Sequence, residues 1–126
     1  MEEIKVAIVT PEGLLFDGEV LNLTLPGAEG EFGVYPHHCS LLSLLKSGVI
    51  ELVSQNHQKE YIAIDWGYAK IDRNKVDILV NGAVAITQDG KMMEAIQKAK
   101  KLIEEASSDY LLISGALSKL EHLARR

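Results

Sequence analysis

The sequence predicts an α+β protein in which an antiparallel β-sandwich or barrel, residues 1–85, is followed by an antiparallel two-helix hairpin, residues 86–126. In the first part apolar residues recur with a period of two, and turn signals follow one another at short spacing. After residue 86 the apolar period becomes that of a helix. The 126 residues, 47% of them apolar, suffice for one domain with a small appendage.

Three strands are predicted near the start of the chain. Ile4, Val6 and Ile8 recur at every second position, which is the period of a strand. One turn is expected around Pro11 and a second at Asp17-Gly18, a dipeptide common in hairpins. The strands separated by these turns cover residues 4–9, 14–16 and 19–25.

A loop rich in glycine and carboxylates is expected next. Pro26 and Gly27 interrupt the alternation, and the loop continues over residues 30–36. Residues 41–45 fit either a strand or one helical turn, and a strand is preferred. Four further strands, separated by turn signals, cover residues 48–54, 59–65, 67–72 and 75–80.

Two amphipathic helices are predicted after residue 86. Their apolar residues follow steps of four and three, so each helix has one stripe that can pack. Asp89 can cap the first helix, and residues 107–109 break the run and can cap the second. So short a connection makes the helices antiparallel. The stripes consist of Met92, Ile96, Ala99, Ile103 and Ala106, then Ile113, Ala116, Leu117, Leu120 and Leu123.

The charge of the chain argues against nucleic acid as a partner. The net charge is −5, whereas nucleic-acid binders usually carry a basic face. Residues 1–87 hold six Lys/Arg against twelve Asp/Glu, and residues 88–126 hold seven against six. Cys39 is the only cysteine, so no internal disulfide can form. Without an apolar run of about 20 residues or a signal-like start, a soluble protein that is not exported is expected.

His37, His38 and Cys39 are the first place to look for a metal or a nucleophile. Neighbouring strand residues point to opposite faces, so these side chains do not offer the converging ligands that zinc requires. A catalytic cysteine needs a base and an orienting group, and Cys39 is expected to be a small buried apolar residue instead. The sequence therefore predicts no catalytic residue, no cofactor and no metal site.

Three other features have ordinary structural interpretations. Glu29 and Glu31 could form a carboxylate pair for acid–base chemistry, but nothing in an exposed loop would raise a pKa, so a solvated loop is preferred. The glycines of this loop lack the lysine and the helix of a phosphate-binding loop. Trp66 is expected to pack within the sheet; an exposed tryptophan would mark a contact site.

Three motifs carry a resemblance to a known family. Residues 10–20 read TPEGLLFDGEV, residues 25–36 read LPGAEGEFGVYP and are followed by His38, and residues 41–50 read LLSLLKSGVI. At this spacing they closely resemble the epsilon subunit of bacterial rotary F-type ATP synthases. The similarity covers essentially the whole chain, including the order of sandwich and hairpin.

The resemblance implies a sandwich of two five-stranded sheets at the foot of the central stalk, in contact with the gamma subunit and the c-ring. Such a rotor subunit is non-catalytic and couples proton flow to ATP synthesis. It would lie at the cytoplasmic face of the bacterial inner membrane, peripheral and associated with it through the complex only. Periodicity alone supports an alternative, a free-standing β-sandwich interaction module. The expected rotor contacts are the polar residues Glu29, Glu31 and His38 and the apolar anchors Phe32 and Tyr35.

The resemblance also implies a regulatory hairpin, which in the family can extend and inhibit ATP hydrolysis by inserting between catalytic beta subunits. The second helix offers few basic residues, so inhibition stays open. Some family members bind ATP through an Asp and an Arg at the start of the first helix. Here Met92 replaces that arginine and cannot pair with phosphate, so ATP binding is not expected. His37 and Trp66 also depart from the family pattern. The hairpin residues expected to matter are Met92, Ile96, Lys119, Arg125 and Arg126.

Overall fold

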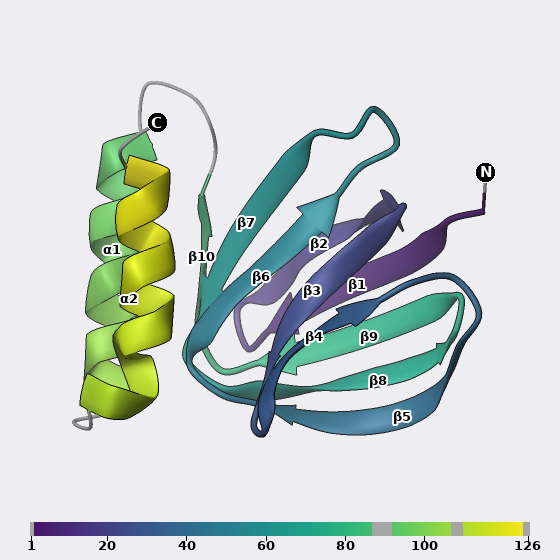
Figure 1. The fold of residues 1–126 in the computed structure, drawn as a ribbon, viewed down its shortest axis with the longest axis horizontal. Coiled ribbons are helices and arrows are strands. Elements are labelled where there is room, and N and C mark those ends of the chain that lie inside the picture. Colours follow the sequence, from purple (N-terminus) through teal and green to yellow (C-terminus); the bar gives the residue numbers. More distant parts are fainter. Residues whose placement is uncertain (1, 87–91, 107–109, 125–126) are drawn as a thin grey trace.

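The structure is a computed structural model in which residues 2–86, 92–106 and 110–124 are described. A strand-rich body is followed by two helices that stand side by side at one end of it (Figure 1). The expected caps at Asp89 and at residues 107–109, and also Arg125 and Arg126, lie outside the described residues. The elements are β1 (Ile4–Thr10), β2 (Gly13–Val20), β3 (Asn22–Gly27), β4 (Gly30–Val34), β5 (His38–Leu45), β6 (Gly48–Val53), β7 (Lys59–Ile64), β8 (Gly67–Arg73), β9 (Lys75–Val80), β10 (Ala83–Ile86), α1 (Met92–Ala106) and α2 (Tyr110–Ala124).

The strands form two five-stranded layers that are joined at one point. One layer has the order β10-β7-β6-β3-β4, and the other has the order β5-β8-β9-β1-β2. The pair Gly27–Leu45 connects β3 to β5, so the hydrogen-bonded network is continuous. Among the described strands, β1 and β9 run parallel and the other pairs are antiparallel. The predicted sandwich is confirmed, with its two sheets linked at Gly27–Leu45.

The space between the layers is filled by one apolar core. Ile4, Val6 and Ile8 of β1 are fully buried, as their alternation predicts. Facing residues of the other layer, such as Leu23 and Ile50, belong to the same cluster. No residue of either helix contributes to this cluster within the described part of the chain, so the sandwich closes its own core.

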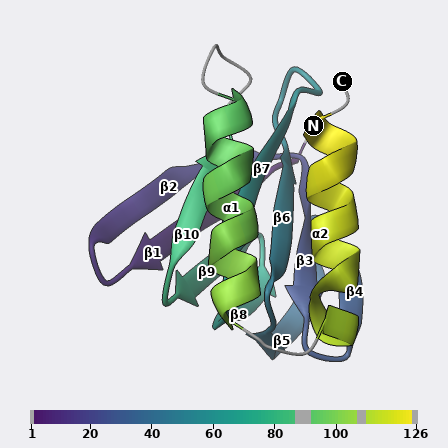
Figure 2. The same cartoon turned by 90° about the vertical axis from the view of Figure 1, so that its left-hand side faces the viewer.

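The helical hairpin covers the outer face of one layer. In Figure 2 both helices lie in front of the β10-β7-β6-β3 layer. The buried stripe of α1 meets Tyr61 on β7 and Ile86 on β10 in a second apolar cluster. The side of α2 that packs there is formed by Leu117, Leu120 and Leu123. The predicted amphipathic helices are confirmed, and their stripes pack on the sheet.

The buried residues of α1 in this second cluster are Ile96, Ala99 and Ile103, which are fully buried. Met92 is half-buried and packs at the edge of the same cluster. The hairpin is therefore held on the sheet by apolar contacts that are separate from the core of the sandwich.

The structure corrects three expectations about the strands. Asp17-Gly18 is not a turn, because β2 runs through it as the partner of β1 and pairs Asp17 with Ala7. Residues 30–34 are not a loop but form β4, which pairs with β3 across a two-residue turn at Ala28 and Glu29. The four-residue strand β10 has too short an apolar run to stand out in the sequence. The preferred strand over residues 41–45 is confirmed within β5.

Candidate functional site

The outer face of the second layer is not covered by the hairpin and carries a row of apolar side chains. Leu44 of β5 pairs with Tyr68 of β8, which pairs with Leu79 of β9. Leu79 is in register with Val9 of β1, and Val9 pairs with Leu14 of β2. Leu44 is 69% exposed and Leu14 is 60% exposed. Five adjacent strands thus contribute one apolar residue each to a continuous exposed row, called the apolar row below.

The next outward row on the same face is mainly charged, although it begins with the exposed Leu42 of β5, which pairs with Lys70. Lys70 of β8 lies beside Asp77 of β9, and Asp77 is in register with Ala7 of β1. Ala7 in turn pairs with Asp17 of β2. On β8 and β9 the face therefore changes from apolar to charged within one step along the strands. An apolar centre beside a polar rim is the usual arrangement of a protein–protein interface.

Trp66 lies in the turn just before β8, two residues before Tyr68 of the apolar row. Its side chain is 57% exposed, so the expectation that it packs within the sheet is wrong. The backbone on both sides of it is fixed: the Trp66 amide donates to Asp65 Oδ1 at 2.7 Å, and Asn81 donates to the Trp66 carbonyl at 3.0 Å. An exposed tryptophan on a fixed turn marks a contact site.

Asp65 holds together the two turns beneath Trp66. Its carboxylate also accepts hydrogen bonds from the Gly82 amide at 2.8 Å and from Asn81 Nδ2 at 2.7 Å. The Ser47 hydroxyl donates to the Asp65 carbonyl at 2.6 Å. Asp65 is nearly buried, and a buried carboxylate is tolerated where donors surround it. The group is therefore structural.

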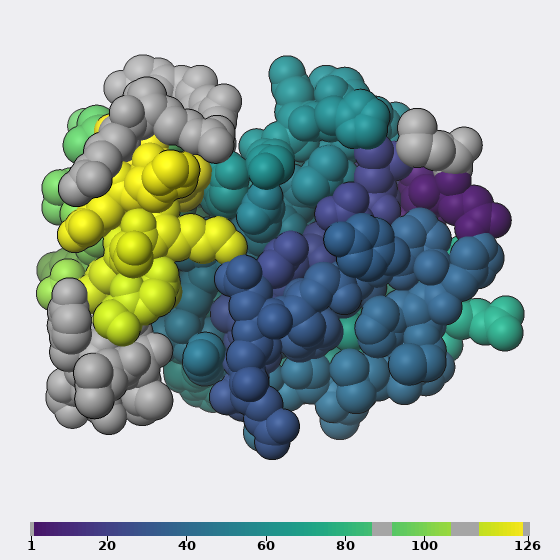
Figure 3. Space-filling view, in the orientation of Figure 1, coloured from purple at the N-terminus to yellow at the C-terminus, as the bar shows by residue number. Residues whose placement is uncertain are grey.

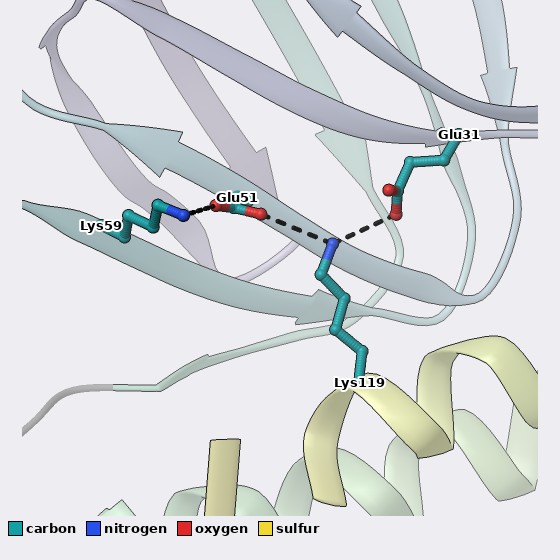
Figure 4. A network of polar contacts seen from close by, with 4 residues as sticks. All are labelled: Glu31, Glu51, Lys59 and Lys119. Carbon is teal, nitrogen blue, oxygen red and sulfur yellow. Dashed lines mark hydrogen bonds and ion pairs between the residues drawn. The ribbon is translucent and has the colours of Figure 1, made fainter. Parts of the chain in front are cut away.

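A second polar cluster joins the hairpin to the sandwich. Lys119 of α2 lies 3.1 Å from Glu31 of β4 and 3.7 Å from Glu51 of β6. Glu51 also pairs with Lys59 of β7 at 3.2 Å. Figure 4 shows the four side chains in a chain of alternating charge. Glu31, an expected rotor contact, thus has a partner inside the protein.

The other expected rotor contacts are distributed over the β3–β4 hairpin and the start of β5. Glu29 is exposed at the β3–β4 turn, and Tyr35 is exposed just after β4. Phe32 is half-buried and packs against the sandwich core. His38 is half-buried, with Nδ1 2.7 Å from the carbonyl oxygen of Cys39. Their assignment as rotor contacts stays a prediction.

Cys39 is exposed, so the expectation of a buried thiol is wrong. The β5–β8 pairing is irregular between His38 and Leu41, which turns this part of β5 out of the regular ladder. His37 lies just before it with a positive φ of 66°, and its Nε2 contacts the carboxylate of Glu2. Within the described residues, no group of three or more His, Cys, Asp or Glu side chains is placed to hold a metal ion.

Two carboxylates near the N-terminus have shifted acidities. Gln55 donates to Glu3 at 2.5 Å, and this hydrogen bond, with a smaller one from Glu19, lowers the pKa of Glu3. The pKa of Glu19 is raised by the hydrogen bond with Glu3 and by the negative charge of the Glu3 carboxylate. Glu19 is exposed and Glu3 is half-buried, and the two carboxyl groups form a hydrogen-bonded pair at the surface rather than a binding site.

Comparison with known sequences identifies the family of this chain. A family profile described as "ATP synthase, Delta/Epsilon chain, beta-sandwich domain" matches residues 3–86. A protein of Helicobacter pylori strain G27 named "ATP synthase epsilon chain" is 49% identical over 98% of this chain and 100% of its own length. One of the same name from Campylobacter curvus is 43% identical over 99% of this chain and 98% of its own.

The chain belongs to the ATP synthase epsilon chain family.

Solved structures share the fold of this family member. A chain in the structure titled "Cryo-EM structure of Euglena gracilis mitochondrial ATP synthase, OSCP/F1/c-ring in rotational state 1" matches with a TM-score of 0.65 and 22% identity, over 96% of this chain and 74% of that one. A chain in the Tetrahymena thermophila structure of the "central stalk/cring" matches with a TM-score of 0.53 and 16% identity, over 83% and 96%. Among the described residues, no helix has the length and apolar character needed to span a bilayer.

The sequence did not reveal the apolar row or the charge cluster. Both depend on register: the row requires Leu44, Tyr68 and Leu79 to be neighbours across strands. One signal in the sequence could have indicated the apolar row: Leu42 and Leu44 are two positions apart on β5, so their side chains point to the same face, and both are exposed. The Lys119–Glu31 contact joins residues 88 positions apart, and no local pattern predicts such a pair.

Proposed function

We propose that this chain is a non-catalytic subunit of the central stalk of a rotary ATP synthase. In that role it binds the gamma subunit and the c-ring and couples rotation of the ring to ATP synthesis. Family membership supports the complex, and the names of the relatives support the position within it. The complex makes the chain a peripheral protein at the cytoplasmic face of the bacterial inner membrane.

The observation that carries this proposal is the apolar row on the uncovered layer. Both layers have apolar side chains on their outer faces, and the hairpin covers those of one layer. Leu44, Tyr68 and Leu79 on the other layer face solvent in the isolated chain. Burying a large apolar side chain contributes about 1.5–3 kcal/mol, so this face is suited to docking on the gamma subunit.

The β3–β4 hairpin is proposed as the contact with the c-ring. Glu29 and Glu31 are exposed on it, and Tyr35 follows it with an exposed ring. Carboxylates at an interface rim set partner choice and register more than affinity. Inhibition of ATP hydrolysis by the hairpin residues Met92, Ile96 and Lys119 stays a prediction, because Ile96 is buried against the sheet in this arrangement.

Co-purification decides between this function and a free-standing interaction module. An affinity-tagged chain expressed in its own host is expected to retain the gamma subunit and the c-ring after detergent extraction of the membranes. A variant with Leu44→Ser and Leu79→Ser is expected to lose gamma. Recovery of the tagged chain as a solitary soluble species would favour the interaction module.

A further inference from the structure

At Gly115, Ala116 and Lys119, α2 borders a hollow in the surface of the sandwich. A cavity of about 410 Å³ separates Gly115, Ala116 and Lys119 from residues 46–49 of the facing layer. A Cβ atom at Gly115 would meet nothing within 4 Å. Among the residues of α2 whose side chains are described, the buried apolar contacts come from Leu117, Leu120 and Leu123, with Ala116 and Ala124 packed beside them. In the space-filling view the surface of α2 (yellow) meets the sandwich along one side of the molecule (Figure 3).

Lys119 reaches across this hollow. Its side chain is 24% exposed, against 54% for Glu31 and 19% for Glu51. The hydrogen bond from Lys119 Nζ to Glu31 Oε2 is 3.1 Å long. In the part of α2 whose side chains are described, Lys119 makes the ion pairs to the sandwich.

The two carboxylates would respond differently to loss of Lys119. Glu51 keeps Lys59, which lies 3.2 Å away on the neighbouring strand. Glu31 has no second ion-pair partner among the described residues. Departure of α2 would therefore leave Glu51 neutralised and uncover the charge of Glu31. Glu31 also lies on β4, which pairs with no strand other than β3 among the described strands.

We propose that Lys119 is a latch between the helical hairpin and the β3–β4 hairpin, and that docking of α2 competes with capture of Glu31 by a basic side chain of a partner. The identity of that partner, the c-ring, rests on the proposed function. Linkage makes the effect reciprocal: a partner cation at Glu31 loosens α2, and undocking of α2 frees Glu31 for the partner. A partly exposed pair of this kind contributes a roughly two- to fivefold effect.

Hydrogen exchange in the isolated full-length chain tests the latch. Lys119→Met, which keeps the apolar stem of the side chain, and Glu31→Gln are each expected to raise exchange of the amides of residues 117–123 roughly two- to fivefold. The double variant is expected to match Lys119→Met alone. Lys101→Met is the control, because Lys101 pairs with Glu105 inside α1 at 4.0 Å. Unchanged exchange in Lys119→Met, or additive effects in the double variant, would overturn the latch.

Binding to membranes that carry the ATP synthase stripped of this subunit tests the competition. Lys119→Met is expected to bind roughly two- to fivefold more tightly than the unchanged chain, and adding Glu31→Gln should abolish the gain. Equal affinity of Lys119→Met and the unchanged chain would overturn the competition. Failure of the unchanged chain to bind at all would instead contradict the proposed function, while the exchange result would still decide the latch.

Discussion

Gly67 of β8 lies so close to Leu79 of β9 that a Cβ atom at position 67 would be 2.1 Å from the Leu79 carbonyl oxygen. It would also lie 2.9 Å from the Cα atom of Val80. Both obstacles are backbone atoms, so neither can rotate away. The close approach fixes the register in which Tyr68 and Leu79 become neighbours in the apolar row.

Gly67→Ala is therefore expected to destabilise the protein by about 2–4 kcal/mol, because the β8–β9 ladder must move apart. Urea unfolding followed by circular dichroism measures the change. Gly115→Ala is the matched control. Position 115 is helical and open, so alanine there is expected to stabilise the chain by up to about 1 kcal/mol. Equal effects of the two substitutions would show that the backbone contact at Gly67 does not limit stability.

Loss of the Asp65 carboxylate is expected to destabilise the protein strongly. Asp65→Ala removes the acceptor for three donors, the amides of Trp66 and Gly82 and the side chain of Asn81. Donors left unsatisfied near the interior cost about 1–3 kcal/mol each before relaxation, so a total loss of about 2–4 kcal/mol is expected. Asp77→Ala on the exposed face is the control and should change little. A small effect of Asp65→Ala would mean that water replaces the carboxylate.

The sandwich is expected to fold without the helices. Its core cluster contains no residue of α1 or α2, so a chain that ends at Ile86 should keep a cooperative unfolding transition. Removal of the hairpin uncovers Val49, Tyr61 and Ala63, and such a patch favours self-association. Ultracentrifugation should detect association of the truncated chain and its suppression by Tyr61→Lys. A fragment without a cooperative transition would place the domain boundary elsewhere.

The Glu3–Glu19 pair predicts a pH-dependent effect of Glu19→Gln. The pKa of Glu19 in the folded protein is raised above its ordinary value of 4.5. The stability that Glu19 contributes is therefore fully present below pH 4.5 and is lost as the pH rises through the pKa of the folded state. A glutamine keeps a donor toward Glu3 at every pH. The variant should therefore have a higher urea midpoint than the unchanged chain at about pH 7 and no advantage at about pH 4. Glu12→Gln, in the β1–β2 turn, is the control; equal gains at both pH values would contradict the raised pKa of Glu19.

Much of the fold could be predicted from the sequence because its signals are local. The alternation of Ile4, Val6 and Ile8 and the helical stripe through Ile96 and Ile103 each depend on residues a few positions apart, and both are confirmed. The β4 strand was missed because glycines occupy two of its five positions and weaken the alternation.

The candidate site could not be predicted in the same way. Whether Leu44 faces solvent depends on which layer the hairpin covers, and that choice is set by the packing of α1 and α2 on β6, β7 and β10. Trp66 is exposed because its turn is fixed by Asp65 and Asn81, which lie 16 positions apart in the sequence. These relationships depend on tertiary contacts, and the local sequence pattern around each residue does not predict them.

Binding of the purified gamma subunit tests the central claim most directly. The apolar row is expected to form the contact, so Leu44→Ser with Leu79→Ser should weaken binding roughly tenfold or more. Both residues are exposed, and the free chain should keep its stability within about 0.5 kcal/mol per substitution. The matched control, Lys70→Ser with Asp77→Ser, changes the next outward row and should cost much less affinity. Full affinity of the Leu44/Leu79 variant, with its fold intact, would contradict the account.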